Sequence, residues 1–209
     1  MIELALAVLA ALFSVVNPMG AVPMFLALTP DHTKEERHTT AFYTSLYFVL
    51  ILLAFFIGGS YILNFFGISL NAMRIAGGLV ILSSGYALLE GKFEQNRAIN
   101  QKVREEALAS HEIAFSPMAM PMLSGPGSIS LLISMYAETP DMSSRLVIAG
   151  VVIVTGLIVF AILRSSPYLY KLLGVTGLKA MSRIMGFIVM TIGVQYIIGG
   201  IVELVKNLV

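Results

Sequence analysis

The sequence Asn17-Pro18-Met19-Gly20 lies in the middle of a segment, residues 4–30, that contains no charged side chain. About 20 apolar residues are enough for a helix to cross a bilayer, so this segment is long enough to span one. A proline inside a helix removes a backbone donor, and its ring clashes with the carbonyl four residues earlier. Gly20 also tolerates backbone angles that other residues avoid. We therefore predict two half-helices joined by an irregular turn near the bilayer midplane.

A second sequence of the same kind, Ser124-Gly125-Pro126-Gly127, lies within the uncharged segment 113–137. A broken helix leaves N–H and C=O groups that need partners, so in lipid a break survives only where protein surrounds it or a cavity adjoins it. Breaks at corresponding places in two halves of a chain are typical of substrate sites in secondary transporters. The two breaks therefore indicate one binding site built from both halves.

The composition is that of a polytopic membrane protein. Of the 209 residues, 57% are hydrophobic and 12% are charged, whereas soluble domains have about 25% charged residues. The net charge of +1 gives no reason to expect nucleic acid as a partner. There is no cysteine, which excludes disulfides and thiolate-bound metals. Because we also find no nucleophile–base pair and no cluster of metal ligands, we predict a protein that is not an enzyme and uses no metal or cofactor.

Six segments are apolar and long enough to span the membrane, at residues 2–29, 41–63, 68–89, 113–137, 146–163 and 180–202. The predicted fold is all-α, with six transmembrane helices of which the first and fourth are broken. We divide the chain into a first three-span repeat (1–90), a hydrophilic cytoplasmic linker (91–112) and a second three-span repeat (113–209). Residues 171–179 are predicted to form a short connection at the membrane surface.

The two halves show internal similarity. Pro18 and Pro126 are 108 residues apart, and Arg-Ile-Ala-Gly at 74–77 matches Arg-Ile-Met-Gly at 183–186 at an offset of 109. Because each repeat has an odd number of spans, the second copy must enter the membrane from the opposite side, as in many inverted-repeat transporters. Small residues recur every seventh position in both copies and predict close helix packing. They are Gly77, Ser84, Gly91, Gly186, Gly193 and Gly200.

The orientation follows from the positive charges. Ten of the thirteen Lys and Arg residues fall on one side of the predicted bundle, and Arg74, Arg145 and Lys206 fall on the other. Since cytoplasmic loops are enriched in Lys and Arg, the first side should be cytoplasmic. Both termini should then lie on the periplasmic or extracellular side of a cytoplasmic (inner) membrane. The predicted partners are the lipid bilayer and a small-molecule substrate, and a homo-oligomer is compatible with the sequence.

The breaks supply groups that suit a zwitterion. Pro18 and Pro126 fit the first position of a second half-helix, where the missing N–H would be unpaired anyway. The next N–H groups form the positive end of the helix dipole and suit a carboxylate, while the free carbonyls of the preceding half-helix suit an ammonium group. Further polar groups come from Ser14, Asn17, Ser124 and Ser128. The alternative is a pair of kinks that only shape the bundle, with the serines bonded to their own helices.

The predicted membrane centre has no ionisable side chain. All twelve acidic residues and all three histidines fall in loops or at span ends, so we find no usual proton relay and expect a substrate without net charge. Arg74 and Arg183 are predicted to extend to opposite membrane surfaces, with gating contacts as the alternative. Gln195, Tyr86 and Thr155 are predicted to form hydrogen bonds between helices.

Five segments resemble the MarC/SnatA family of bacterial and archaeal inner-membrane proteins. They are Asn-Pro-Met-Gly-Ala-Val-Pro-Met-Phe at 17–25, Phe-Gly-Ile-Ser at 66–69, Arg-Ile-Ala-Gly-Gly at 74–78, Pro-Met-Ala-Met-Pro-Met-Leu-Ser-Gly-Pro-Gly-Ser-Ile at 117–129 and Ser-Arg-Ile-Met-Gly-Phe at 182–187. The resemblance covers nearly the whole chain. It implies six spans and, for the SnatA branch, proton-linked transport of small neutral amino acids such as glycine and alanine.

The resemblance also gives signature positions, which we take as candidate substrate contacts. They are Asn17, Pro18, Gly20, Pro23, Pro121, Ser124, Gly125, Pro126 and Gly127. We predict that the backbone at Met19–Gly20 and at Gly127–Ser128 holds a carboxylate. Asn17 and the carbonyls before each break are predicted to hold the amine.

Two other functions fit parts of the pattern. Aquaporins also place Asn-Pro turns in two inverted three-span repeats, but their half-helices are additional to six full spans, whereas here the breaks lie inside spans. The second alternative is a membrane scaffold that transports nothing, because a fold alone does not fix function. Counterflow separates these possibilities, since a carrier saturates and exchanges substrate and a channel does neither.

Overall fold

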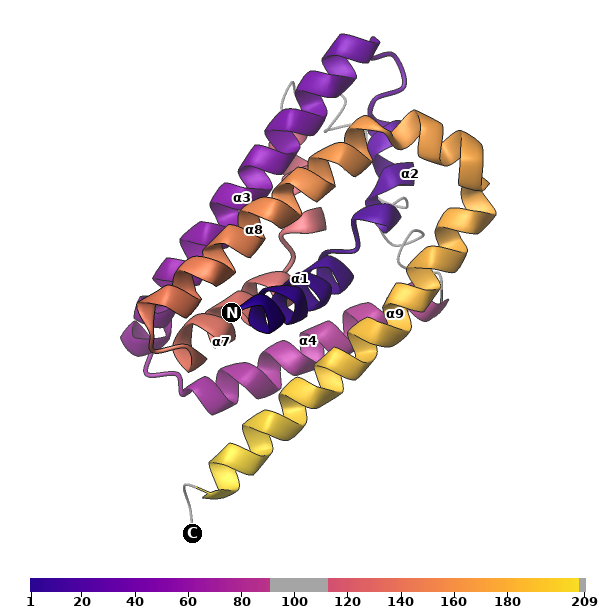
Figure 1. Ribbon diagram of the computed structural model, residues 1–209. Helices are drawn as coiled ribbons and strands as arrows, with labels where there is room; N and C mark the ends of the chain where they lie inside the picture. Colours follow the sequence, from indigo (N-terminus) through magenta and orange to yellow (C-terminus); the bar gives the residue numbers. More distant parts are fainter. Residues whose placement is uncertain (91–112, 207–209) are drawn as a thin grey trace.

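The computed structural model describes residues 1–90 and 113–206, and every regular element in these ranges is a helix (Figure 1). Five of these helices are long and apolar enough to cross a membrane, and the number rises to six if the bent pair at 114–138 counts as one span. The predicted all-α membrane fold is therefore confirmed. The linker predicted at 91–112 lies outside the described residues.

The helices follow the predicted spans, with shifted ends. They are α1 (Ile2–Val16), α2 (Pro18–Leu28), α3 (Lys34–Phe65), α4 (Leu70–Glu90), η1 (Ala114–Leu123), α7 (Pro126–Glu138), α8 (Met142–Arg164) and α9 (Ser166–Lys206). α3 begins before its apolar segment because a capping box closes its first turn. The Glu36 N–H donates to the Thr33 hydroxyl at 3.2 Å, and the Thr33 N–H donates to the Glu36 carboxylate at 2.8 Å.

α8 begins at a second side-chain cap, Asp141. Its carboxylate accepts hydrogen bonds from the Ser144 N–H at 2.8 Å and from the Ser143 hydroxyl at 3.0 Å. Hydrogen bonds from Ser144 and then Ser143 lower the pKa of Asp141 to about 2. The cap therefore stays charged at every pH that a cell experiences, and it is lost only when the pH falls through that value.

α9 is longer than the predicted last span. The surface connection predicted at 171–179 is instead helical on both sides of Gly174, whose φ is 62°. Glycine adopts such an angle at little cost because it has no Cβ, so two helical pieces join there without a loop. Figure 1 shows the resulting change of direction between the first turns of α9 and its long C-terminal part.

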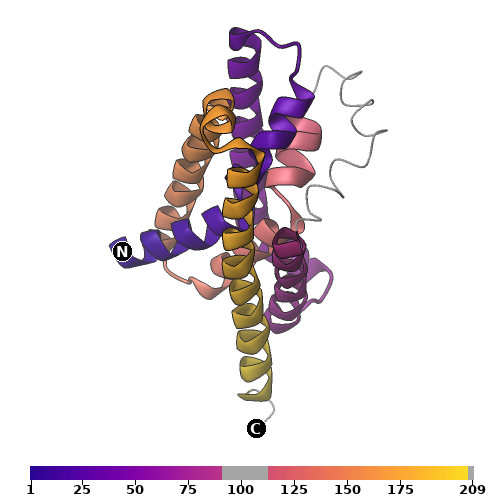
Figure 2. The ribbon, with the colours of Figure 1, turned by 90° about the vertical axis from the view of Figure 1, so that its right-hand side faces the viewer.

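Long helices form the outside of the molecule, and the broken segments lie between them. α3 and α8 lie side by side, and α4 packs against α9 (Figures 1 and 2). α1 runs from the periphery toward the centre, across the direction of α3 and α9 in Figure 2. The main core contains side chains of α1, α2, α3, η1, α7 and α8, including Phe25, Phe48 and Phe56. Large apolar side chains on α3, α8 and α9 stay exposed, as helices that face lipid require.

α4 and α9 approach so closely that glycines meet backbone. A Cβ added to Gly78 would lie 2.7 Å from the Gly193 carbonyl oxygen, and one added to Gly85 would lie 2.7 Å from the Gly186 carbonyl oxygen. The numbering rises along one helix as it falls along the other, so the two helices are antiparallel. Small residues allow such close approach in lipid, where apolar side chains gain nothing by leaving the solvent.

The glycine seam is confirmed on α9, but its α4 side is shifted by one residue from the prediction. Gly77 faces α7, where an added Cβ would overlap the Ser130 hydroxyl. One residue turns the chain by about 100° around a helix, so Gly77 and Gly78 meet different neighbours. Gly91 lies outside the described residues. The antiparallel α4–α9 pair is compatible with inverted repeats, and the repeat relation itself stays a prediction.

We predict that Gly193→Ala destabilises the protein and that Gly199→Ala, on the same helix, does not. A methyl group at Gly193 would lie 2.6–2.9 Å from backbone atoms of α4, whereas one at Gly199 would meet no atom within 4 Å. Overpacking of this kind costs about 1–3 kcal/mol. Thermal unfolding of the purified variants in detergent measures the difference. Equal melting temperatures for the two variants would contradict the close contact between α4 and α9.

Candidate functional site

Asn17 forms the break between α1 and α2. It is the only residue other than glycine with a positive φ in the described ranges, at φ 46° and ψ 63°. Asn tolerates this conformation because its short polar side chain bonds locally. Its N–H donates to the Phe13 carbonyl at 3.0 Å and ends α1, while its Oδ1 accepts from the Gly20 N–H at 3.3 Å and begins α2. One residue therefore caps both half-helices, and Pro18 occupies the first position of α2.

The first break leaves backbone groups without partners. Pro18 has no N–H to pair with the Ser14 carbonyl four residues earlier. In the described part of the chain, no donor reaches the carbonyls of Ser14, Val15 or Val16. The Met19 N–H, in the first turn of α2, likewise has no acceptor there. The end of α1 therefore offers acceptors and the start of α2 offers a donor.

The segment before the second break is less regular than predicted. η1 is a π-type segment, in which the Ser124 N–H donates to the Ala119 carbonyl five residues earlier at 2.8 Å. Ser116 and Met120 have extended backbone angles, because a residue that precedes proline is pushed out of the helical region. The peptide bonds before the prolines at 117 and 121 are cis. The expected regular half-helix is therefore wrong for this half, although the break itself is confirmed, with a bend of 64°.

Gly125 precedes α7 as its N-cap and has a φ of −74°, which any residue can adopt. A Cβ there would lie 3.2 Å from the Pro121 carbonyl oxygen, so this position is restricted by space. Gly20 and Gly127 lie within helices. The expectation that Gly20 provides an unusual backbone angle is therefore wrong, and at the two breaks Asn17 alone supplies a left-handed turn.

The first turn of α7 supplies further free donors. The N–H groups of Gly127 and Ser128 find no acceptor within the described residues, as is usual for the first turn of a helix. In a water-filled loop such groups would bond to solvent, but both residues are buried. They therefore add positive dipole ends to the protein interior.

The two breaks lie close together, and α9 packs beside the first of them. A Cβ on Gly127 would lie 3.5 Å from Val15 of α1, and η1 contacts α2. A Cβ on Gly20 would lie 2.5 Å from Asn17 Nδ2 and 3.0 Å from the hydroxyl of Ser182 on α9. Elements from both halves of the chain therefore meet around the first turn of α2.

Three side-chain atoms at the two breaks and on the adjoining α9 are buried and unpaired in the described chain, namely Asn17 Nδ2, Ser124 Oγ and Ser182 Oγ. These residues are 4%, 1% and 6% exposed. An unsatisfied buried polar group costs about 1–3 kcal/mol, so each such group in a native protein needs an explanation, for example a water, an ion or a ligand. We call these three side chains, with the unpaired backbone groups of the two breaks, the central polar cluster.

Two of the predicted polar side chains form hydrogen bonds within their own segments. The Ser14 hydroxyl donates to the Ala10 carbonyl at 2.7 Å, and the Ser128 hydroxyl donates to the Gly125 carbonyl at 2.9 Å. For Ser14 and Ser128 the structure therefore matches the alternative in which serines bond to their own helices. Thr155 behaves in the same way, with a bond to a carbonyl of its own helix at 2.8 Å, so its predicted interhelical bond is wrong.

The signature prolines differ in their surroundings. Pro18 is buried at the start of α2, and Pro23 is half-buried within α2, where it removes the donor for the Met19 carbonyl. Pro121 and Pro126 are exposed. The prolines of the first break therefore shape the interior, whereas those of the second break lie at the surface of the described chain.

Ser182 was not among the predicted site residues. Its signal in the sequence is weak, because a single serine inside an apolar span is more often bonded to its own helix. Ser130 and Ser134 of α7 were also missed, and both hydroxyls are buried without a partner in the described ranges. Their spacing of four residues puts them on one face of α7, the helix that begins at the second break.

Arg74 joins three helices at the far end of α7. Its guanidinium pairs with Glu138, the last residue of α7, at 2.6 Å and with Glu203 of α9 at 2.5 Å. The Arg74 side chain is only 14% exposed. Arg74 therefore makes contacts between helices, whereas Arg183 is exposed. The gating contacts given as the alternative role of both arginines stay a prediction. Within residues 1–90 and 113–206, no cluster of three His, Asp or Glu could hold a metal ion.

Broken apolar helices, a buried polar cluster where they meet and an apolar exterior define a class of protein. The molecule is a helical integral membrane protein with discontinuous spanning helices. The model of the MarC family, described as integral membrane proteins, matches residues 2–205. The chain therefore belongs to the MarC family.

Known relatives agree over nearly the whole length. The chain is 40% identical over 192 residues to the UPF0056 membrane protein MJ1677 of Methanocaldococcus jannaschii, covering 91% of this chain and 92% of that protein. It is 33% identical over 208 residues to the UPF0056 inner membrane protein MarC of Salmonella typhimurium, covering 95% and 94%. No solved structure matches this chain. The relatives and the apolar helices support a multi-pass protein of the inner membrane.

We predict that Asn17→Gly leaves stability nearly unchanged and that Asn17→Ala lowers it. Glycine accepts the positive φ and costs only a few tenths of a kcal/mol as an N-cap. Alanine keeps neither the cap nor an easy left-handed conformation, and the conformation alone costs about 1–2 kcal/mol. Chemical or thermal unfolding in detergent compares the two variants. A less stable Asn17→Gly than Asn17→Ala would contradict the assigned backbone at this turn.

Proposed function

We propose that the protein is a secondary transporter that moves small neutral amino acids, such as glycine and alanine, across the cytoplasmic membrane by alternating access. The observation that supports this most is the central polar cluster, in which the two breaks leave donors and acceptors buried and unpaired in an apolar interior. The segments 4–30 and 113–137 that form it contain no charged residue. A ligand there must supply hydrogen bonds and bring no net charge, which a zwitterion does.

The donors of the cluster suit the substrate carboxylate. The Met19 N–H begins α2, and the Gly127 and Ser128 N–H groups begin α7. Asn17 was predicted to hold the amine, but its Oδ1 is occupied by the Gly20 N–H and its free atom, Nδ2, is a donor. In this proposal Asn17 therefore binds the carboxylate. Charge-assisted bonds of this kind contribute about 1.5–3 kcal/mol each.

The acceptors of the cluster suit the substrate ammonium group. The carbonyls of Ser14, Val15 and Val16 end α1, and the Ser124 hydroxyl lies at the second break. The Gly125 carbonyl is already engaged by the Ser128 hydroxyl and the Ile129 N–H, so it contributes less than predicted. The end of α1 and the start of α2 then hold opposite ends of one small molecule.

The space around the cluster favours small substrates. Gly20 has no room for a Cβ beside Asn17 and Ser182, and Gly127 packs against Ile81 and Val15. The cluster is buried, so a substrate reaches it only when the surrounding helices separate. This requirement favours a carrier over an open channel.

In such a carrier, the Arg74 ion pairs would keep one side closed by holding α4, α7 and α9 together. α7 begins at Pro126 beside the cluster and ends at Glu138, which pairs with Arg74. A tilt of α7 that opens the cluster would therefore also strain or break this pair. In this proposal the proton linkage that the family resemblance implies acts at this ion pair, because Glu138 holds Arg74 through its charge.

The zwitterion model predicts a clear ranking of competitors for labelled glycine uptake and counterflow in proteoliposomes. Glycinamide lacks the carboxylate and N-acetylglycine lacks the amine, so each should compete at least ~10-fold more weakly than glycine, since about 1.4 kcal/mol is a factor of ten. Alanine should compete within about tenfold of glycine, because it keeps both charged groups and a tenfold loss corresponds to about 1.4 kcal/mol. Equal competition by glycinamide would rule out the carboxylate contacts, and absence of counterflow would favour a channel or a scaffold.

The closure model predicts that Glu138→Gln weakens the dependence of glycine flux on a pH gradient. The amide keeps the shape of the side chain but has no charge to hold Arg74. The matched control is Glu3→Gln, because Glu3 makes no ion pair in the described chain. The measurement is initial flux with and without an imposed gradient. If the flux of Glu138→Gln depends on the gradient as strongly as that of the parent protein, proton linkage does not act through Glu138.

A further inference from the structure

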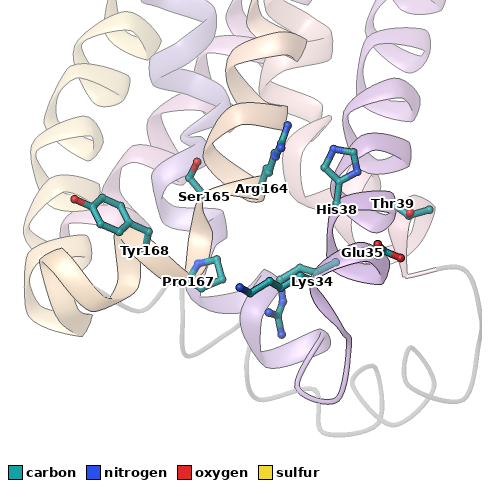
Figure 3. Close-up of a pocket in the computed structure, with 9 residues that line it drawn as sticks. Lys34, Glu35, His38, Thr39, Arg164, Ser165, Pro167 and Tyr168 are labelled. Carbon is teal, nitrogen blue, oxygen red and sulfur yellow. The ribbon is translucent and has the colours of Figure 1, made fainter.

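A second polar feature lies where α3 begins, α8 ends and α9 begins. These elements enclose a cavity of about 720 Å³, within the size range of small-molecule sites. Figure 3 shows Lys34 and His38 of α3 on one wall and Arg164, Ser165 and Pro167 on the other. This end of the bundle is the predicted cytoplasmic side.

The cations of this cavity lack carboxylate partners. Neither Lys34 nor Arg164 forms an ion pair with a described residue. Arg37 donates Nε to the Thr29 hydroxyl at 3.3 Å and one Nη to the Thr29 carbonyl at 2.7 Å, which leaves its other N–H groups free. Glu35 is the single carboxylate on the lining and lies beyond ion-pair distance of all three. The cavity therefore has an excess of positive charge that an anion could neutralise.

An aromatic patch of α3 and α8, formed by His38, Phe42 and Phe160, adjoins the cavity through His38. The Phe160 ring lies 5.3 Å from the His38 ring and 6.1 Å from the Phe42 ring, and the Arg164 guanidinium lies 6.0 Å above it. Phe42 is 49% exposed. Next to the charged side chains, this patch thus presents apolar rings where the apolar spans begin.

We propose that this cavity binds the phosphate of an anionic phospholipid headgroup, with an acyl chain along Phe42 and Phe160. Arg guanidinium groups suit the geometry of phosphate, and Lys adds a point charge. A free phosphate ion presents the same charged oxygens, but it has no acyl chain to contact Phe42 and Phe160. Basic pockets between spanning helices on the cytoplasmic side are typical sites for anionic lipid headgroups. The proposal is independent of the transport function, since it concerns a separate surface.

The test is native mass spectrometry of the full-length protein in detergent, titrated with phosphatidylglycerol or phosphatidylcholine of equal chain length. We expect phosphatidylglycerol to bind at least about fivefold more tightly, since each basic residue near a membrane surface contributes about 1 kcal/mol. Lys34→Gln and Arg164→Gln should each lower that affinity by about fivefold. Lys171→Gln removes one exposed charge from the same end outside the cavity, so it should have no effect.

Three results would overturn the proposal. Equal binding of the two lipids would show no preference for an anion, and an equal loss in Lys171→Gln would show a general effect of charge. Displacement of phosphatidylglycerol by millimolar inorganic phosphate would show that the cavity binds a free anion instead of a lipid. Thermal unfolding of each variant separates a loss of binding from a loss of folding, and the double variant Lys34→Gln with Arg164→Gln should lose the preference completely.

Discussion

The structure depends on one constraint, the need of every backbone N–H and C=O group for a partner inside an apolar bundle. A straight helix meets this need by itself, but a helix interrupted by proline cannot. Asn17 provides some of these partners, because its N–H pairs with a carbonyl in the last turn of α1 and its side chain accepts from an N–H in the first turn of α2. The carbonyls of Ser14, Val15 and Val16 and the N–H of Met19 remain unpaired in the described chain. A small molecule that forms hydrogen bonds with these groups therefore gains binding free energy.

The remaining helices surround these incomplete segments with a more continuous structure. α4 and α9 meet through glycine backbone, and α3 and α8 lie side by side as nearly uninterrupted helices. Tight helix pairs resist deformation, since a packed interface has few alternative arrangements. Relative movement is easier at the breaks, where backbone bonds are already missing. This division suits a carrier in which long helix pairs move as bodies around a polar centre.

The two ends of the molecule differ in their electrostatics. At one end Arg74 is paired with two carboxylates and joins α4, α7 and α9. At the other end Lys34 and Arg164 line a cavity without an ionic partner in the described residues. Paired charges hold helices together, whereas unpaired charges at a membrane surface attract anions. The same residue types therefore join helices at one end and, in our proposal, bind a lipid headgroup at the other.

The sequence by itself determined the all-α membrane fold, the two breaks and the glycine seam on α9, because hydropathy, proline and small residues act locally or with a fixed helical period. It also identified Asn17 and Ser124, two of the three side chains of the central polar cluster whose buried atoms stay unpaired in the described ranges. Only the tertiary structure decided that Ser14 and Ser128 are engaged by their own segments, that Gly78 rather than Gly77 meets α9, and that Ser182 approaches the first turn of α2. The two serine bonds are local, but the sequence allows a serine to bond to its own segment or to another group. The other two facts depend on the rotation of each helix about its axis and on contacts between residues more than 100 positions apart, which no local pattern specifies.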